Sequence, residues 1–437
     1  MRGVAIRLFV TCWLVYAAHF ATNTVREIYP ALSLGDRLSF DVSEYVGLHP
    51  DIFELPGRGA FINNNPGASI LGAAPYALAR PVIDVIVERA QQARATASGE
   101  IRDYNTDFPL REEFYRKAYE RGLDVKLALA AGVMQAFVMA PLSALSAVVM
   151  FYVLVKLTRS LRASLALSLL YAFVTPVFYR TAQLNHNLLL GHFAFFAFVL
   201  LWRPWDDHTG PKRPFYFLAA GLLAGWTVVL DYSGLVAVIA LSIYALVRWL
   251  RLPEPAKSLF DLPQFALGVA LSGAMLVWYQ WASFDHPIYP AQHYMPATQF
   301  SDQGYSGFSW PSLDLLWRSA FGIKFGLFAF APFLALALYV PGWFSQRIRL
   351  VGSLEAGFIL WITLGFFLFS AANQFGYVQF NTGVRHTVPV TPFLFLVAAG
   401  VFLRLPAIPA AITGVAATYC RGAWRCTGKW ETDTPWE

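Results

Sequence analysis

Charge is scarce in this sequence. Only 14% of the 437 residues are Asp, Glu, Lys or Arg, against about 25% in soluble globular proteins. Hydrophobic residues make up 57% of the chain, which is more than one water-surrounded core can hide. This composition excludes an ordinary cytosolic enzyme, a disordered protein and a fibrous repeat. It predicts an all-α polytopic membrane protein, and the 16% of aromatic residues suit the two membrane interfaces.

Cysteine and the motifs of soluble enzymes are also scarce. The three cysteines, Cys12, Cys420 and Cys426, are too few and too scattered for a disulfide framework or a cysteine metal site. The chain has no phosphate-cradling P-loop, no GxGxxG after a strand, no GxSxG and no HExxH. ATP-driven transport is therefore unsupported. The basic residues form short clusters between apolar runs, as in cytoplasmic loops, so we expect no nucleic-acid partner despite a net charge of +6.

Long apolar segments recur along most of the chain. A spanning helix needs roughly 17–25 mostly apolar residues, and we expect about 10–11 such helices here. No internal repeat is evident, which weighs against an inverted-repeat transporter. Residues 404–437 hold a weak last apolar segment, near 407–419, and a tail of unknown role. The other segments are 4–21, 127–155, 164–181, 188–202, 215–231, 233–249, 262–284, 325–344, 354–372 and 387–403.

The short loops predict the orientation of the chain. Lys and Arg gather in alternate loops, and the richer set is expected on the cytoplasmic side. This places the N-terminus in the cytoplasm and two long loops, 22–126 and 285–324, outside. In the first loop, apolar spacing over 82–92 predicts an amphipathic helix along the membrane surface. Charges at helical spacing over 107–124 predict a solvated helix, with Glu112, Glu113, Arg116 and Lys117 on its exposed face.

Ionisable groups near the membrane are functional candidates because burying them is costly. The first loop, which we expect outside the membrane, carries four acidic residues. A carboxylate there can act as a general base that removes a proton from an incoming hydroxyl. It can equally cap a helix or supply an oxygen ligand to Mg²⁺ or Mn²⁺, so the use of a metal stays open. The four acids are Asp36, Asp41, Glu44 and Asp51.

Polar side chains also mark the outer ends of later helices. Amides and imidazoles between two spans can bind sugar hydroxyls or satisfy the backbone of a broken helix. An acid at the end of one helix can cap the next helix or belong to a site. Isolated Lys or Arg residues at the start of a helix can bind a phosphate, although their side chains can also extend to lipid headgroups. These candidate binding residues are Asn185, His186, Asp231, Tyr232, Lys324, Arg385 and His386.

Residues 4–403 resemble the GT-C membrane glycosyltransferases, in particular bacterial relatives of the protein mannosyltransferases and aminoarabinose transferases (glycosyltransferase family 39-like). The resemblance rests on the order of helices and loops and on four segments. These are "LSLGDRLSFD" followed by "GRGAFINNNPGASILGAAPYAL", then "AGLLAGWTVVLDYSG", "FGIKFGLFAFAPFLALAL" and "NTGVRHTVPVTPFLFL". Two features depart from the family pattern. Asp41 and Glu44 stand where "D-E-x-x-Y" is commoner, and "NNNPG" replaces "KPP".

The resemblance implies an enzyme of the bacterial inner membrane. Such an enzyme moves a sugar, with inversion, from a polyprenyl-phosphate donor to a lipid, glycan or protein acceptor on the extracytoplasmic face. It implies Asp41 as the general base, with Asp36, Glu44 and Asp51 as alternatives, and Lys324 and Arg385 as phosphate ligands beside His386. The Asp41→Asn variant should then lose sugar transfer but still fold. The alternative functions are a transporter or flippase of lipid-linked sugars and a non-catalytic membrane protein.

Overall fold

The computed structural model describes residues 1–21, 25–96, 109–205, 215–253, 257–297, 300–377 and 384–404. The protein is mostly helical, with 72% helix and 3% strand, so the all-α class is confirmed. Four described helices are long and apolar enough to cross a membrane, which supports a membrane protein. These helices are α3 (Gly67–Thr96), the continuous helix Asp124–Thr158, α12 (Asp261–Phe284) and α16 (Ser353–Ala372).

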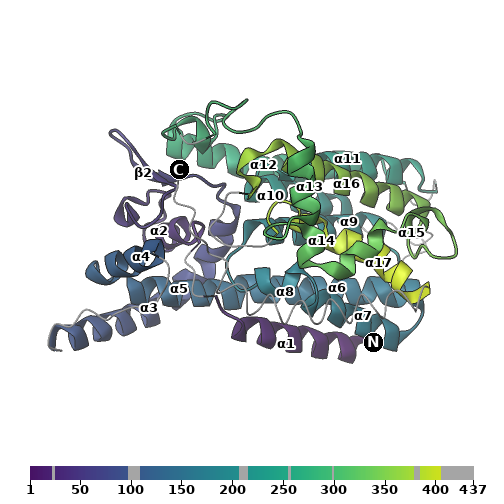
Figure 1. Cartoon of the computed structure of the whole chain (residues 1–437), viewed down its shortest axis with the longest axis horizontal. Coiled ribbons are helices and arrows are strands. Elements are labelled where there is room, and N and C mark those ends of the chain that lie inside the picture. The colour runs from purple at the N-terminus through teal and green to yellow at the C-terminus, as the bar shows by residue number, and fades with distance from the viewer. Residues whose placement is uncertain are drawn as a thin grey trace.

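The main body is a helical bundle whose members run along the long axis of the molecule (Figure 1). The first-loop elements gather at the end of this bundle that lies opposite the N-terminus. Small residues allow close helix contacts, since a Cβ on Gly221 would lie 2.1 Å from the Phe265 carbonyl oxygen. Besides α12 and α16, the bundle contains α1 (Arg2–Ala18), α6 (Ala140–Thr158), α7 (Leu161–Phe173), α9 (His186–Trp202), α10 (Tyr216–Leu230), α11 (Gly234–Leu250) and α17 (Thr391–Arg404).

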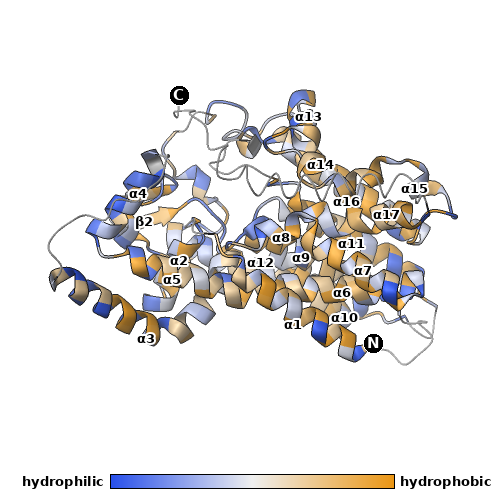
Figure 2. Ribbon diagram, turned by 60° about the horizontal axis from the view of Figure 1, so that its bottom comes forward, coloured by the Kyte–Doolittle hydropathy of each residue, from blue (hydrophilic) through white to orange (hydrophobic). Residues whose placement is uncertain are grey.

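The bundle helices are rich in apolar residues, as the orange in their ribbons shows (Figure 2), and many of their large apolar side chains are exposed. On α11, one side is buried against neighbouring helices and the other is exposed. A water-facing helix would carry polar groups on that exposed side, whereas a lipid-facing helix carries aliphatic ones. The exposed side chains recur at helical spacing and are Leu235, Ile239, Ile243 and Leu246.

The helix Asp124–Thr158 is interrupted by one wider turn. It comprises α5 (Asp124–Met134), a π-helical turn at Gln135–Met139 and α6. Pro141 follows this turn and has no backbone N–H, so the regular ladder cannot continue unchanged. The buried side chain of Gln135 donates hydrogen bonds from the turn, at 2.6 Å to the Tyr16 carbonyl oxygen, and so attaches it to α1.

Two predicted spanning segments do not form continuous helices, and the prediction is wrong there. In the segment 164–181, α7 ends at Phe173. A separate helix, α8 (Pro176–Arg180), then begins with Thr175 as its N-cap. Prolines explain both breaks, because a proline within a helix lacks the N–H donor and clashes with the preceding turn. The segment 325–344 consists of α14 (Leu327–Phe330), a 3₁₀ helix at Pro332–Leu338 and α15 (Pro341–Phe344).

The described part of the first loop contains a β-hairpin that the sequence did not predict. Strands β1 (Ile52–Leu55) and β2 (Gly59–Ile62) pair antiparallel, with Phe53 opposite Phe61. The turn contains Gly57 at φ +78°, a left-handed conformation that glycine adopts without strain. Helix α2 (Ile28–Arg37) precedes the hairpin.

The two helices predicted in the first loop are both present. Residues 82–92 belong to α3, whose 30 residues make it long enough to be a candidate span rather than only a short surface helix. The solvated helix is α4 (Pro109–Glu120), which carries ion pairs from Arg116 to Glu120 at 2.9 Å and from Lys117 to Glu113 at 2.7 Å. The weak segment near 407–419 and the tail from 405 onward, with Cys420 and Cys426, lie outside the described residues. Cys12 is buried and free.

Candidate functional site

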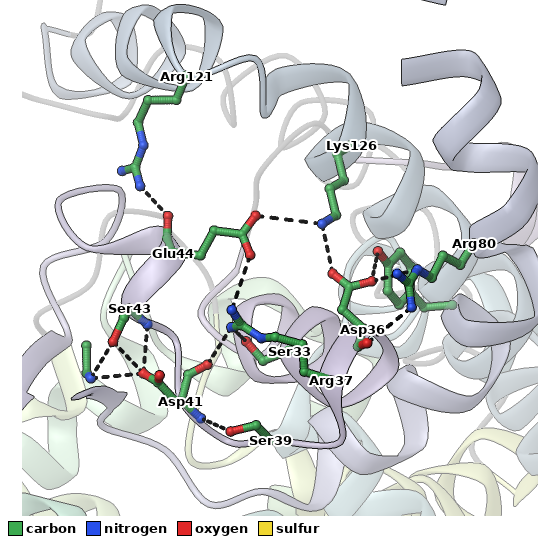
Figure 3. A network of polar contacts seen from close by, with 12 residues as sticks. Ser33, Asp36, Arg37, Ser39, Asp41, Ser43, Glu44, Arg80, Arg121 and Lys126 are labelled. Carbon is green, nitrogen blue, oxygen red and sulfur yellow. Dashed lines mark hydrogen bonds and ion pairs between the residues drawn. The ribbon is translucent and has the colours of Figure 1, made fainter. Parts of the chain in front are cut away.

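The predicted acids divide between two groups of polar side chains. The first, which we name the loop network, lies within the first loop (Figure 3) and consists of Asp36, Arg37, Asp41, Glu44, Arg80 and Lys126. The second, which we name the junction cluster, lies where the first loop meets the ends of bundle helices. It consists of Arg26, Glu27, Asp51, His186, Asn187, Asp231, Arg385 and His386.

Asp36 is the centre of the loop network. Its carboxylate accepts from the Tyr76 hydroxyl at 2.8 Å and pairs with Lys126 at 2.8 Å and with Arg80 at 3.2 Å. These three partners come from α3 and α5, whereas Asp36 lies on α2. The carboxylate therefore connects three helices of the first loop, and its oxygens are occupied by donors.

Asp41, our first choice of base from the sequence, fixes the edge of the hairpin. Its Oδ1 accepts hydrogen bonds from the backbone N–H of Ser43 at 2.9 Å and of Ala60 at 3.0 Å, and from the Ser43 hydroxyl. Burial raises the pKa of Asp41, but these hydrogen bonds outweigh it and leave the pKa below its ordinary value. Asp41 is thus a weak base whose carboxylate holds the hairpin in place. The Glu44 carboxylate lies 3.8 Å from both Arg37 and Lys126.

The junction cluster draws on five segments of the chain. Arg26 and Glu27 precede α2, Asp51 precedes β1, His186 and Asn187 start α9, Asp231 links α10 to α11, and Arg385 and His386 precede α17. The Nδ1 of His186 is hydrogen-bonded to the Glu27 carboxylate, and its Nε2 lies 3.5 Å from Oδ2 of Asp231. Arg26 binds Asp51 at 3.0 Å. Residues far apart in the sequence therefore meet at one end of the bundle.

The acids of this cluster are ionised. Burial raises the pKa of Glu27, but the charge and hydrogen bond of His186, together with Arg26, lower it to about 2. Burial likewise raises the pKa of Asp231, and His186 and His386 reverse the effect, so that the net pKa is lowered. Both carboxylates can therefore stabilise a positive charge on a neighbouring imidazole at neutral pH.

Arg385 and His386 interact electrostatically with the other members of the cluster. Burial, followed by repulsion from Arg26, lowers the pKa of Arg385 to about 10, so its guanidinium stays protonated at neutral pH. Burial and then the charge of Arg385 lower the pKa of His386 to about 3, so this imidazole is neutral. Both residues also line a recess with Arg318, Ser319 and Thr387. The Nδ1 of His386 is buried and has no hydrogen-bond partner among the described residues.

Arg180 is a further cation beside this region. Arg180 is only 5% exposed, and its Nε and Nη2 have no hydrogen-bond partner within the described part of the chain. The neighbouring Tyr179 hydroxyl accepts from the backbone N–H of Val384 at 3.4 Å, which places α8 against the segment that carries Arg385. A buried guanidinium without an acid is costly, so this geometry favours an anionic ligand.

The remaining predicted binding residues have defined places. Asn185 caps α9, since its Oδ1 accepts from the Leu188 backbone N–H at 2.8 Å. The Tyr232 hydroxyl accepts from Gln280 at 2.8 Å. Asp231 is not the N-cap of α11, because Ser233 holds that position; the Asp231 Oδ1 accepts from the Ser233 N–H at 2.8 Å, and its Oδ2 lies 3.5 Å from the Nε2 of His186. Lys324 is exposed, and no ion pair or hydrogen bond among described residues joins it to Arg385.

Sequence reasoning missed Arg26 and Glu27. Both follow the first apolar segment directly, and a charged pair at that position was the available signal. Of the four predicted acids, Asp51 is the one whose ion pair belongs to the junction cluster. No group of three or more His, Cys, Asp or Glu suited to a metal ion occurs among the residues that the structure describes. The Mg²⁺ or Mn²⁺ hypothesis therefore gains no candidate ligand set there.

No protein-family model matches the chain, and no curated protein or solved structure is significantly similar to it.

Proposed function

We propose that this protein is a membrane glycosyltransferase that moves a sugar from a polyprenyl-phosphate donor to an acceptor on the extracytoplasmic face, with inversion. The observation that carries the proposal is the junction cluster. It combines a buried carboxylate–imidazole pair, Glu27 with His186, and a half-buried guanidinium, Arg385, at the end of the bundle that adjoins the first loop. Glycosyl transfer needs both kinds of group, one for the proton and one for the leaving phosphate.

Arg385 and Arg180 support the phosphate half of the reaction. When the bond between the sugar C1 and the phosphate oxygen breaks, negative charge collects on the phosphate, and fixed guanidinium groups stabilise it. The Arg180 Nε and Nη2 have no hydrogen-bond partner among the described residues, and α8 is joined to the segment of Arg385 through Tyr179. The lipid part of such a donor would remain in the bilayer beside the apolar outer surface of the bundle.

The junction cluster also supports the acid–base half. Glu27 and Asp51 of the first loop belong to this cluster, and Glu27 is hydrogen-bonded to His186, so the proposed acid–base group lies in the junction cluster rather than at Asp41. In a single displacement the acceptor hydroxyl attacks C1 on the face opposite the phosphate, and the configuration inverts. A site in the bacterial inner membrane that faces outward would accept lipid, glycan or protein hydroxyls.

The proposal is tested with the full chain reconstituted in liposomes. Labelled polyprenyl-phosphate sugars are added with a membrane-extract acceptor pool, and transfer is measured together with the release of free polyprenyl phosphate. We expect transfer by the unmodified protein and a loss of about 100-fold or more in Arg385→Ala, because a charge-stabilising donor is removed. Arg116→Ala, on the solvated face of α4, is the matched control.

Two results would contradict the proposal. Movement of intact donor between the leaflets without cleavage would favour the flippase alternative. Full transfer by a correctly folded Arg385→Ala protein would remove the proposed phosphate site.

A further inference from the structure

Glu27 contacts the rest of the junction cluster through His186 and Arg26. The residue is 3% exposed, and its Oε1 is shared between the Nδ1 of His186 and the Nε of Arg26, which is 3.6 Å away. The contact with His186 is the means by which its charge reaches the rest of the cluster. A buried carboxylate on one ring nitrogen fixes the orientation of the imidazole and its tautomer, with the proton on Nδ1.

The other ring nitrogen faces two polar groups. Asn187 Nδ2 lies 2.9 Å from the Nε2 of His186, and Asp231 Oδ2 lies 3.5 Å from it. An amide donor beside Nε2 agrees with a neutral ring that carries a lone pair on this nitrogen. The Asp231 side chain is 21% exposed and is the more open of the two carboxylates that face His186. Its charge stabilises the imidazolium once Nε2 takes a proton.

Building on the proposed transferase function, we propose that His186 is the catalytic base, that Glu27 is its positioning residue, and that Asp231 stabilises the imidazolium. The acceptor is a hydroxyl compound. Its O–H proton moves to His186 Nε2 while its oxygen bonds to the sugar C1. The bond from C1 to the phosphate oxygen breaks, and its electron pair leaves with the polyprenyl phosphate, where Arg385 faces the new charge. The proton returns from Nε2 to water or to the leaving phosphate.

The other first-loop acids fit this role less well. Asp51 is held by Arg26 at 3.0 Å, and a carboxylate in such a pair gives up part of its basicity. The Oδ1 of Asp41 already accepts three hydrogen bonds from Ser43 and Ala60. His186 Nε2, by contrast, has an amide neighbour that a hydroxyl can displace.

A double-mutant cycle tests the unit formed by Glu27 and His186. The full chain in liposomes is assayed as Glu27→Gln, His186→Gln and the double variant, with Glu113→Gln on the solvated face of α4 as the matched control. We expect each single variant to lower kcat by about 100-fold to 10,000-fold with little change in donor KM. The double variant should be no slower than His186→Gln alone, because residues that act as a unit are not additive.

The outcomes separate this inference from the proposed function. Absence of transfer by the unmodified protein overturns both. Transfer by the unmodified protein with multiplicative losses in the double variant, or with full kcat in a folded His186→Gln protein, overturns the role of His186 alone.

A measurement that does not depend on activity covers the case of a variant that fails to fold. In protein labelled with ¹⁵N-histidine, the His186 signals should show a proton on Nδ1 in the unmodified chain, and Asp231→Asn should keep that tautomer. A proton on Nε2 with a bare Nδ1 in the unmodified protein would overturn the arrangement.

Discussion

The loop network and the junction cluster both contain Asp, Glu and Arg, but they differ in how completely their polar atoms are paired. In the loop network, Asp36 and Asp41 each have several donors, and the partners come from the first loop and the adjoining α5. Two members of the junction cluster retain a buried atom without a partner among the described residues, Asn187 (Oδ1) and His386 (Nδ1), and so do Arg180 (Nε and Nη2) and Ser233 (Oγ) beside it. No member of the loop network has such an atom in the described part of the chain, although the Tyr45 hydroxyl next to Glu44 does.

This difference separates a structural from a functional use of charge. A fully satisfied network stabilises the positions of its own elements and has little left to offer a ligand. Buried polar groups without partners are uncommon in folded proteins and need a reason. A substrate that brings phosphate oxygens and hydroxyl groups would satisfy the open atoms of the junction cluster, so we interpret this cluster as the site and the loop network as its support.

Within this comparison of the two regions, we expect the largest change in activity with little change in stability at Arg180. Replacing it by Met removes a buried, incompletely paired guanidinium, so transfer should fall by about 100-fold through loss of phosphate stabilisation. The free energy of unfolding should change little or even rise, because no acid is left unpaired. Transfer kinetics and thermal unfolding in the same detergent check this prediction. A strongly destabilised but fully active Arg180→Met protein would contradict the role of Arg180 in phosphate binding and would indicate a structural role instead.

Asp36 should show the opposite behaviour. Asp36→Asn leaves Lys126 and Arg80 without their carboxylate, and breaking a buried pair typically costs about 3–5 kcal/mol. Since the Arg80 side chain is 42% exposed, we expect a loss of about 2 kcal/mol. Below the unfolding temperature, transfer should remain within about threefold. Denaturant or thermal unfolding measures the loss of stability, and initial rates measure transfer. Loss of transfer in a stably folded Asp36→Asn protein would contradict the purely structural role of the loop network.

The ion pairs of the junction cluster predict a pH dependence of stability. The folded-state pKa of Glu27 is about 2, below its ordinary value of 4.5, and that of Asp51 is also lowered once Arg26 and His49 outweigh burial. Groups with lowered pKa values stabilise the protein above the unfolded-state pKa, and this stability is lost as the pH falls through the folded-state pKa. The unfolding temperature should therefore fall from about pH 4.5 downward. Glu27→Gln should reduce this slope, and an unchanged slope would contradict the ionised state of Glu27.

Composition and periodicity predicted the helical class and most of the apolar segments. They failed at 164–181 and 325–344, where hydropathy counts apolar residues but prolines set where a helix can continue. The hairpin at 52–62 was missed because its strands have four residues each, too few for a clear alternating pattern.

The site was predicted in part, for a related reason. His186, Asp231, Arg385 and His386 stood out because polar groups at helix ends are visible in a sequence, whereas the partner of each group is decided by tertiary packing. The sequence analysis singled out the four acids from Asp36 to Asp51 and not Glu27. Glu27 immediately precedes α2, whereas those four acids lie at the end of α2 or after it. Spacing alone could not tell that Asp41 would turn towards the hairpin and Glu27 towards His186.

The smallest expected effect is at Asp41, and it decides between the sequence-based and the structure-based choice of base. An asparagine at this position keeps an oxygen that can accept from the N–H groups of Ser43 and Ala60, so stability should fall by only about 1 kcal/mol. Transfer by Asp41→Asn should stay within about threefold of the unmodified protein, while His186→Gln is strongly impaired. Side-by-side initial rates at equal donor concentration measure this contrast. If the folded Asp41→Asn protein lost transfer as completely as His186→Gln, the two regions would share one catalytic role, and the pairing of polar atoms would no longer separate support from site.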